Sequence, residues 1–220
     1  MKQQLPIIIL VVTLIMSLKM NAQFCGIKDP SIERYTSCPT SHSQLFNRSY
    51  HWFNVLNPSI ATSDYYQEGS SCNFGGFIAA GGIKISYCPT CFSTSCERTF
   101  YPGCGRAGIF VNYFDGSQDP KYKEFIGTRV DLIRGRNYSL SIDIQRSNDP
   151  SSNTIERDLV IYGYNGALPA AQVGYCPTGA VPIDTISRTL FNTDSNKTII
   201  SNFICPQNFS YLIIGGNCDD

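Results

Sequence analysis

The sequence has little charge, and the charge that it has is balanced. Charged residues make up 15% of the 220 residues, and the 17 lysines and arginines match the 17 aspartates and glutamates. The chain has no basic run, so nothing indicates a nucleic-acid-binding surface or a patch that holds anionic lipid. Histidine is also scarce, because only His42 and His51 occur, and there is no G-x-S-x-G motif. These absences argue against a hydrolase built on a nucleophile–histidine triad.

Long apolar runs are scarce as well, and the single one lies at the N-terminus. Lys2 precedes an almost unbroken apolar stretch over residues 5–18, which is shorter than the roughly 20 residues that a membrane-spanning helix needs. We interpret residues 1–22 as a secretory signal peptide cleaved near Ala22 or Gln23, with a short uncleaved anchor as the alternative. The remaining residues, 23–220, are expected to form one domain without a membrane span, secreted outside the cell or held at its surface.

Cysteine, by contrast, is abundant. All ten cysteines follow the apolar run, and an even number in an exported chain predicts up to five disulfides whose pairing the sequence leaves open. Four of them lie in CPTCFSTSCERTFYPGC at residues 88–104. A zinc site of four thiolates, a thioredoxin-like pair at Cys88 and Cys91, and a loop held by two disulfides are the alternatives. Export and the lack of a βαβ pattern favour the loop. The expected disulfide cysteines are Cys25, Cys38, Cys72, Cys88, Cys91, Cys96, Cys104, Cys176, Cys205 and Cys218.

Helical periodicity is nearly absent, and short alternating runs separated by turn residues take its place. In residues 138–145 the apolar side chains of Leu140, Ile142 and Ile144 share one face with Tyr138, while polar side chains share the other. This alternation predicts a strand with one buried side. The same reasoning predicts strands at residues 106–114, 124–130, 158–164, 198–203 and 209–214, with loops at residues 115–121, 146–153 and 175–182.

The order of these strands predicts the fold class. Leu132, Gly135 and Tyr138 form an L-x-x-G-x-x-Y segment, which we interpret as a tight connection between paired strands. Many short strands at this spacing favour an all-β fold, an antiparallel two-sheet β-sandwich or jelly roll, here rich in disulfides. The sequence contains no linker and no internal repeat, so one domain over residues 23–220 is expected.

A larger pattern of motifs resembles a known family. Residues 29–39, DPSIERYTSCP, are similar to an opening of the form N-x-S-F-E-x-Y-x-x-C-P, and TSDYY, RAGI and YKEFIG follow in the family's order. The segment YLIIGGNCDD at residues 211–220 is similar to the end of that domain. Together these motifs resemble the secreted β-sandwich domain of gliding and type IX-secreting Gram-negative bacteria. That domain often precedes OmpA-like or surface-sorting modules and is similar in plan to galactose-binding-like jelly rolls.

The resemblance carries several expectations. It implies a disulfide between Cys38 and Cys72, and a structural calcium ion at Glu33 as the only cofactor. The family continues into a further strand, so the resemblance also implies that this chain lacks its final strand, either as a truncated product or as a divergent standalone form. The family has no firmly assigned activity.

Aromatic side chains are the expected ligand-binding groups, because a flat ring stacks on the apolar face of a sugar. Trp52 has an alternative role as an anchor in the core. Tyr162 and Tyr164 alternate with Leu159 and Ile161, so we expect their side chains to face outward or to line a groove. The full set of expected ligand-binding residues is Trp52, Tyr65, Tyr66, Tyr113, Tyr162 and Tyr164.

These features predict an exported, non-catalytic binding or adhesion module that recognises carbohydrate or a cell-surface polymer. The first alternative is a structural or assembly component of a bacterial surface machine with a protein partner, which an exposed apolar strand edge would favour. A glycan-active enzyme with paired carboxylates is the third interpretation.

Overall fold

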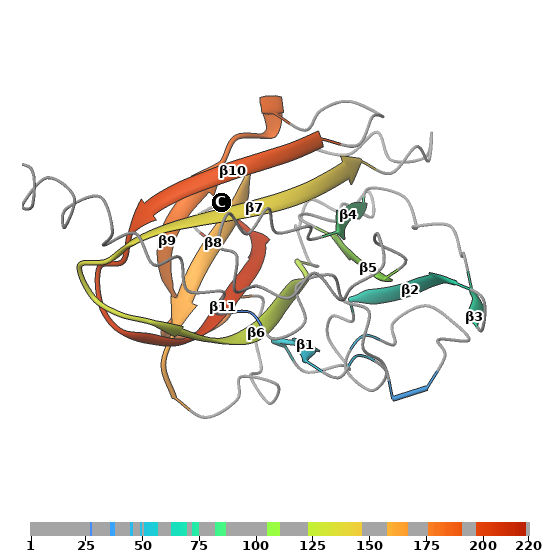
Figure 1. Cartoon of the computed structure of the whole chain (residues 1–220), viewed down its shortest axis with the longest axis horizontal. Helices are drawn as coiled ribbons and strands as arrows, with labels where there is room; N and C mark the ends of the chain where they lie inside the picture. The colour runs from blue at the N-terminus through green and yellow to red at the C-terminus, as the bar shows by residue number, and fades with distance from the viewer. Residues whose placement is uncertain are drawn as a thin grey trace, which may run out of the picture. The chain divides into compact units, whose positions relative to one another are not determined.

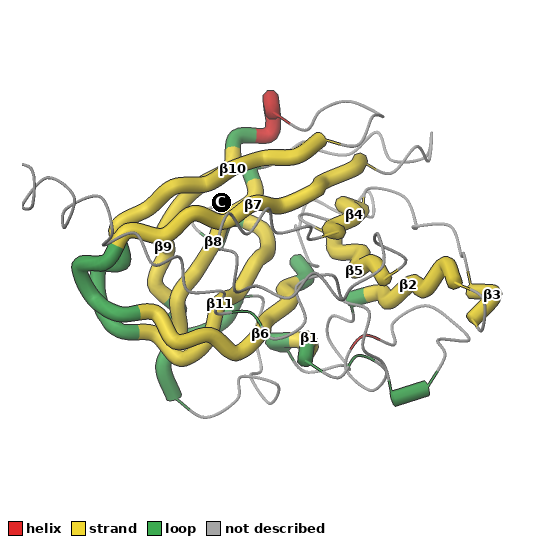
Figure 2. The backbone as a smooth tube through the Cα atoms, in the orientation of Figure 1, coloured by secondary structure: helices red, strands yellow, loops and turns green. Residues whose placement is uncertain are grey.

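A computed structural model of the chain describes residues 27, 36–37, 45, 49, 51–56, 63–69, 72–74, 82–86, 105–110, 123–146, 158–166, 176–190 and 197–218. All of them belong to one compact unit formed by Gly26–Thr90 and Thr99–Asp220. The backbone of these residues is strand-rich and every strand pair is antiparallel, which confirms the expected all-β class (Figures 1 and 2).

The strands form two sheets. The five-stranded sheet has the order β1-β6-β11-β8-β9, with β1 at Trp52–Asn54, β6 at Phe125–Leu132, β11 at Phe209–Gly216, β8 at Leu159–Tyr164 and β9 at Val181–Ile186. The six-stranded sheet has the order β10-β7-β4-β5-β2-β3. Its strands are β10 at Lys197–Ile204, β7 at Asn137–Arg146, β4 at Gly82–Ser86, β5 at Gly105–Phe110, β2 at Asp64–Gly69 and β3 at Cys72–Phe74. A 3-10 turn, η2 (Arg188–Leu190), follows β9.

The expected hairpin at the L-x-x-G-x-x-Y segment is instead a crossover between the sheets. β6 pairs with β1 and β11, whereas β7 pairs with β10 and β4, so the connection leaves one sheet and enters the other. Gly135 has a φ of 76°, which a residue with a Cβ adopts only with strain. The turn is fastened to the connection between β10 and β11, because Gly135 N donates to Cys205 O at 2.8 Å and Cys205 N donates to Arg136 O at 2.9 Å. The two crossovers therefore lie side by side.

A core of apolar side chains joins residues from both sheets. Leu140, Ile142 and Ile144 of β7 are buried in the same cluster as Leu159 and Ile161 of β8. The predicted alternation of residues 138–145 is confirmed on its apolar side. The cluster also contains residues of β5, β6, β9, β10 and β11, so side chains far apart in the sequence share one core.

The five-stranded sheet carries a second apolar cluster, formed mainly by the alternate residues of its strands. Val160 and Tyr162 of β8 lie in this cluster with Phe125 of β6 and Ile213 of β11. Gly215 lies opposite Phe125 in the strand register, and a Cβ at Gly215 would overlap the Phe125 ring. Both faces of β8 are therefore buried under apolar side chains. The sequence predicted only one buried face for this strand.

The predicted loop at residues 175–182 is wrong at its end, because β9 begins at Val181. Proline at position 182 reads as a loop residue in the sequence, but an edge strand tolerates proline, and β9 is the terminal strand of its sheet.

Candidate functional site

Trp52 lies in the interior of the protein. Only 2% of its surface is exposed, and it belongs to the core cluster that joins residues of both sheets. A buried indole offers no open face to a sugar, so the expectation that Trp52 binds a ligand is wrong for this structure. The alternative role of Trp52 as a core anchor is confirmed.

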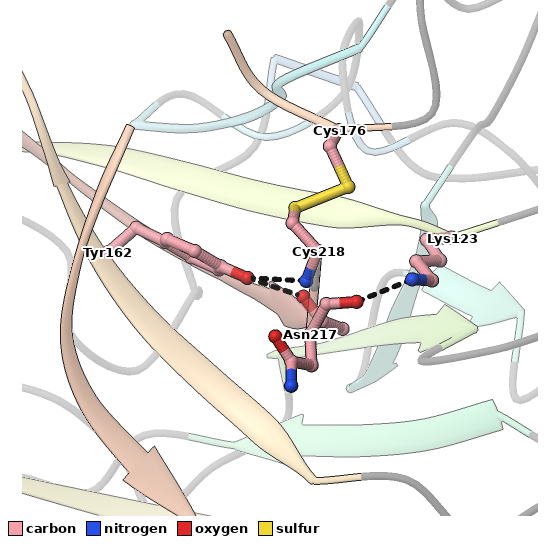
Figure 3. Close-up of a disulfide and its surroundings, with 6 residues drawn as sticks. Lys123, Tyr162, Cys176, Asn217 and Cys218 are labelled. Carbon is pink, nitrogen blue, oxygen red and sulfur yellow. Dashed lines mark hydrogen bonds between the residues drawn. A yellow bond between two sulfur atoms is a disulfide. The ribbon is translucent and has the colours of Figure 1, made fainter. Parts of the chain in front are cut away.

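Tyr162 is also buried, which corrects the expectation that it faces outward. Its exposed fraction is 3%, because the second apolar cluster covers the side of β8 from which it projects. The Tyr162 hydroxyl makes its hydrogen bonds to groups inside the protein. It donates a hydrogen bond to Gly216 O at 2.8 Å and accepts one from Cys218 N at 3.1 Å (Figure 3). The structure thus gives Tyr162 a packing and hydrogen-bonding role.

The residues after β11 are fixed by three kinds of contact in one place (Figure 3). Cys218 forms a disulfide with Cys176, with a Cα–Cα distance of 5.8 Å. Lys123 is 5% exposed, and its ammonium group donates a hydrogen bond to Asn217 O. Together with the Tyr162 hydroxyl, these contacts hold the end of β11 to β8, to Cys176 and to Lys123. This confirms Cys176 and Cys218 as disulfide cysteines. The contacts around Cys218 have a structural role.

Tyr164 is half-buried. Its ring packs beside the second apolar cluster, with its centroid 6.2 Å from the Tyr211 ring centroid. The exposed Asn165 follows it and links the end of β8 to β11, since Ser210 N donates to Asn165 Oδ1 at 3.0 Å. Of the three expected ligand-binding residues whose side chains are described, Tyr164 is the one that keeps partial exposure.

The structure describes no side chain for the remaining expected ligand-binding residues. Tyr65 and Tyr66 lie in β2, opposite Ala107 and Arg106 of β5, and their backbone alone is described. Tyr113 lies outside the described residues. Their expected roles stay predictions.

Metal binding also stays a prediction. Glu33, the expected calcium ligand, lies outside the described residues. Within the part of the chain that the structure describes, no group of three or more His, Cys, Asp or Glu side chains could hold a metal ion.

Cys205 is a free cysteine, which corrects the expectation that it forms a disulfide. The thiol is buried in the core cluster and its Sγ donates a hydrogen bond to Gln207 O at 2.9 Å. Burial raises the pKa of the Cys205 thiol, and the hydrogen bond to Gln207 opposes that shift. A neutral, buried thiol is a poor nucleophile, so this residue packs rather than reacts. The side chain of Cys72 is not described, and Cys25, Cys38, Cys88, Cys91, Cys96 and Cys104 lie outside the described residues, so their pairing stays a prediction.

Among the described residues, the most exposed large apolar side chains lie on β10, and the sequence interpretation missed them. Ile200 is 60% exposed and Ile204 is 66% exposed, whereas Ile199 on the opposite face of the strand is buried. β10 is the terminal strand of the six-stranded sheet, with β7 as its neighbour (Figure 1). A signal was present, because residues 199–204 carry isoleucine or phenylalanine on both alternating faces, while a strand with one buried face needs them on one.

The edges of the two sheets meet at β10. Ser201 Oγ donates a hydrogen bond to the Asp184 carboxylate of β9, the terminal strand of the other sheet. Ser201 is buried and points away from the exposed face that carries Ile200. This contact fixes β10 against β9, while the Ile200 and Ile204 side chains remain exposed.

Within the described residues, no helix is long and apolar enough to cross a membrane. No protein-family model, curated protein or solved structure matches the chain.

Proposed function

We propose that this chain is an exported, non-catalytic binding module of the cell surface that assembles with a protein partner along β10. The observation that carries the proposal is the pair of exposed isoleucines on a terminal strand, at 60% and 66% exposure. Terminal strands present backbone N–H and C=O groups that can pair with another strand, and apolar side chains beside them add affinity and specificity.

The proposal includes a finer architecture, in which the two antiparallel sheets stack as a β-sandwich of jelly-roll type. Its support is the core cluster that contains residues of both sheets. Such a scaffold holds a terminal strand rigidly, because the strand is paired on one side and packed on one face. Export from the cell is supported by the N-terminal apolar run, and a non-catalytic role by the scarcity of histidine.

A protein partner is preferred to a sugar because of where the aromatic side chains lie. Trp52 and Tyr162 are buried, so neither offers a ring face to a ligand. Sugar binding by stacking needs an accessible ring. The exposed apolar surface found here belongs instead to a strand edge, which suits an extended polypeptide.

The proposal is tested with a photo-crosslinking amino acid at position 202 of the chain in the cells that secrete it. Asn202 is exposed and lies between the two exposed isoleucines. Asp131 of β6 is exposed on the other sheet and serves as the matched control position. We expect a discrete protein adduct from position 202 and none from position 131. Equal labelling at both positions, or no adduct at position 202, would contradict the proposal.

Carbohydrate binding remains a second candidate, favoured by the partial exposure of Tyr164 beside the exposed turn at Asn165. A glycan array and a polysaccharide pull-down with the wild-type chain and Tyr164→Ala test it. Binding that is lost in Tyr164→Ala supports this candidate. No signal above background for the wild-type chain rejects it.

A further inference from the structure

The four terminal strands of the two sheets are protected to very different degrees. Natural sheets block their edges with short strands, proline, bulges or charges. β1 and β3 are three residues long each. β9 carries Pro182 and Asp184, and its pairing with β8 has a register shift. β10 has eight residues and pairs with β7 over its whole length without a shift.

The composition of β10 adds to this contrast. From position 198 to position 204 the strand has no charged residue, no proline and no glycine. Its exposed face carries Ile200, Asn202 and Ile204 in succession, with isoleucine on either side of the amide. The exposed apolar side chains are therefore placed symmetrically about Asn202.

The hydrogen bonding of the crossover fixes which backbone groups face outward. Cys205 N donates to Arg136 O at 2.9 Å, directly beyond the pairing of Ile204 with Asn137. Along an antiparallel pair, residues alternate between bonding to the neighbour and pointing their N–H and C=O away from it. The backbone groups of Ile200, Asn202 and Ile204 therefore point away from β7.

We propose that the protein partner is a second copy of this chain, which pairs its own β10 antiparallel to the first about a two-fold axis through Asn202. This inference rests on the proposed function. In that register Ile200 lies opposite the second copy's Ile204, Ile204 lies opposite the second copy's Ile200, and the two Asn202 amides meet between them. The six-stranded sheets of the two copies become one continuous sheet.

This register is preferred because the interface of a two-fold dimer must be self-complementary. An axis through Ile200 places Ile204 opposite position 196, an asparagine. An axis through Ser201 places Ile200 opposite Asn202. The axis through Asn202 alone matches both exposed isoleucines with isoleucine, and cross-strand pairs of β-branched residues stabilise antiparallel sheets. No like charges face each other across it, since residues 198–204 carry none.

The expected dimer is weak. The three outward-facing residues give about six backbone hydrogen bonds between the copies. A contact made mainly by one strand per subunit falls below about 1,200 Å² of buried surface, the range of transient complexes. We therefore expect a dissociation constant in the micromolar range and a dimer that forms at high local concentration, as on a cell surface.

Sedimentation velocity on the purified secreted chain tests the inference, from about 1 to 200 μM. We expect reversible dimerisation of the wild-type chain. Ile200→Lys puts a charged side chain opposite the second copy's Ile204 in place of each isoleucine–isoleucine pair, and weakens dimerisation at least tenfold. Asn202→Pro removes an outward-facing N–H and is expected to abolish it, while leaving the pairing with β7 intact. Leu190→Lys changes an equally apolar residue, 50% exposed on η2, and is the matched control that dimerises as the wild type does.

Each variant is first checked by circular dichroism, and amide hydrogen exchange supplies a second readout. Exchange at Ile200, Asn202 and Ile204 slows with protein concentration if β10 pairs with itself. A wild-type chain that stays monomeric, or a dimer that persists in both β10 variants, overturns the inference. If the chain is monomeric but position 202 crosslinks to a different protein, this inference fails and the proposed function stands.

Discussion

Replacing Tyr162 by phenylalanine removes one oxygen atom and leaves the ring in place. That oxygen donates to Gly216 O at 2.8 Å and accepts from Cys218 N at 3.1 Å. The ring is 3% exposed, so water does not readily take the place of the hydroxyl. A buried backbone group that loses its partner costs about 1–3 kcal/mol. We therefore expect Tyr162→Phe to lower the free energy of unfolding by about 2 kcal/mol.

Urea unfolding followed by tryptophan fluorescence measures this loss. With an m-value of about 2 kcal/mol per molar urea, the midpoint falls by about 1 M. The same atom is removed by Tyr138→Phe, the matched control. The Tyr138 hydroxyl accepts a hydrogen bond from Ile133 N at 2.8 Å in an exposed turn, where water can replace it. We expect the control to lose about 0.5 kcal/mol or less.

The comparison separates a structural Tyr162 from a ligand-binding one. If Tyr162→Phe unfolds at the same urea concentration as the wild type, the hydroxyl is not satisfying buried backbone groups, and the assignment of Tyr162 to the interior is refuted. If both phenylalanine variants lose equal stability, the argument from burial is refuted instead.

Three further predictions follow from the same region and from the core. Replacing Cys176 and Cys218 by serine opens a loop with a sequence separation of 42, and loop entropy predicts a loss of about 4 kcal/mol; an unchanged thermal midpoint under non-reducing conditions would count against the bond. Gly215→Val places side-chain atoms against the Phe125 ring and should cost at least 1–3 kcal/mol in urea unfolding, as overpacking typically does; wild-type stability would show that the ring is free to move. Burial raises the pKa of the Cys205 thiol, so the folded chain keeps this proton to a higher pH than the unfolded chain does. The stability contributed by this group is therefore lost as the pH rises through the folded pKa. Iodoacetamide labelling at pH 8 should reach Cys205 only in denaturant, and rapid labelling of the native chain would refute its burial.

The sequence predicted the positions of the strands better than it predicted which strands pair with each other. The alternation at residues 138–145 identified β7 to within one residue at each end, because one face of that strand is apolar and the other is polar. The L-x-x-G-x-x-Y segment correctly indicated a turn at Gly135. The sequence could not tell a hairpin from a crossover there, since the choice depends on which distant strands pair with β6 and β7.

The candidate site was harder to predict, for a physical reason. Alternation along β8 correctly separates Leu159 and Ile161 from Tyr162. Whether the second face meets solvent or another apolar layer depends on Val55, Phe125 and Ile213, which lie far away in the sequence. The exposed face of β10 was missed for the converse reason, because its isoleucines resemble core residues until the edge position of the strand is known.

The free thiol of Cys205 has a consequence for the oxidation state of the whole chain. With ten cysteines in the sequence and one of them unpaired, nine remain, an odd number. The chain can then close at most four internal disulfides, and Cys176–Cys218 is one of them. The nine other cysteines of this sequence therefore cannot all pair with one another. In an oxidising environment the core shields Cys205 itself from a mixed disulfide with a small thiol or with another polypeptide.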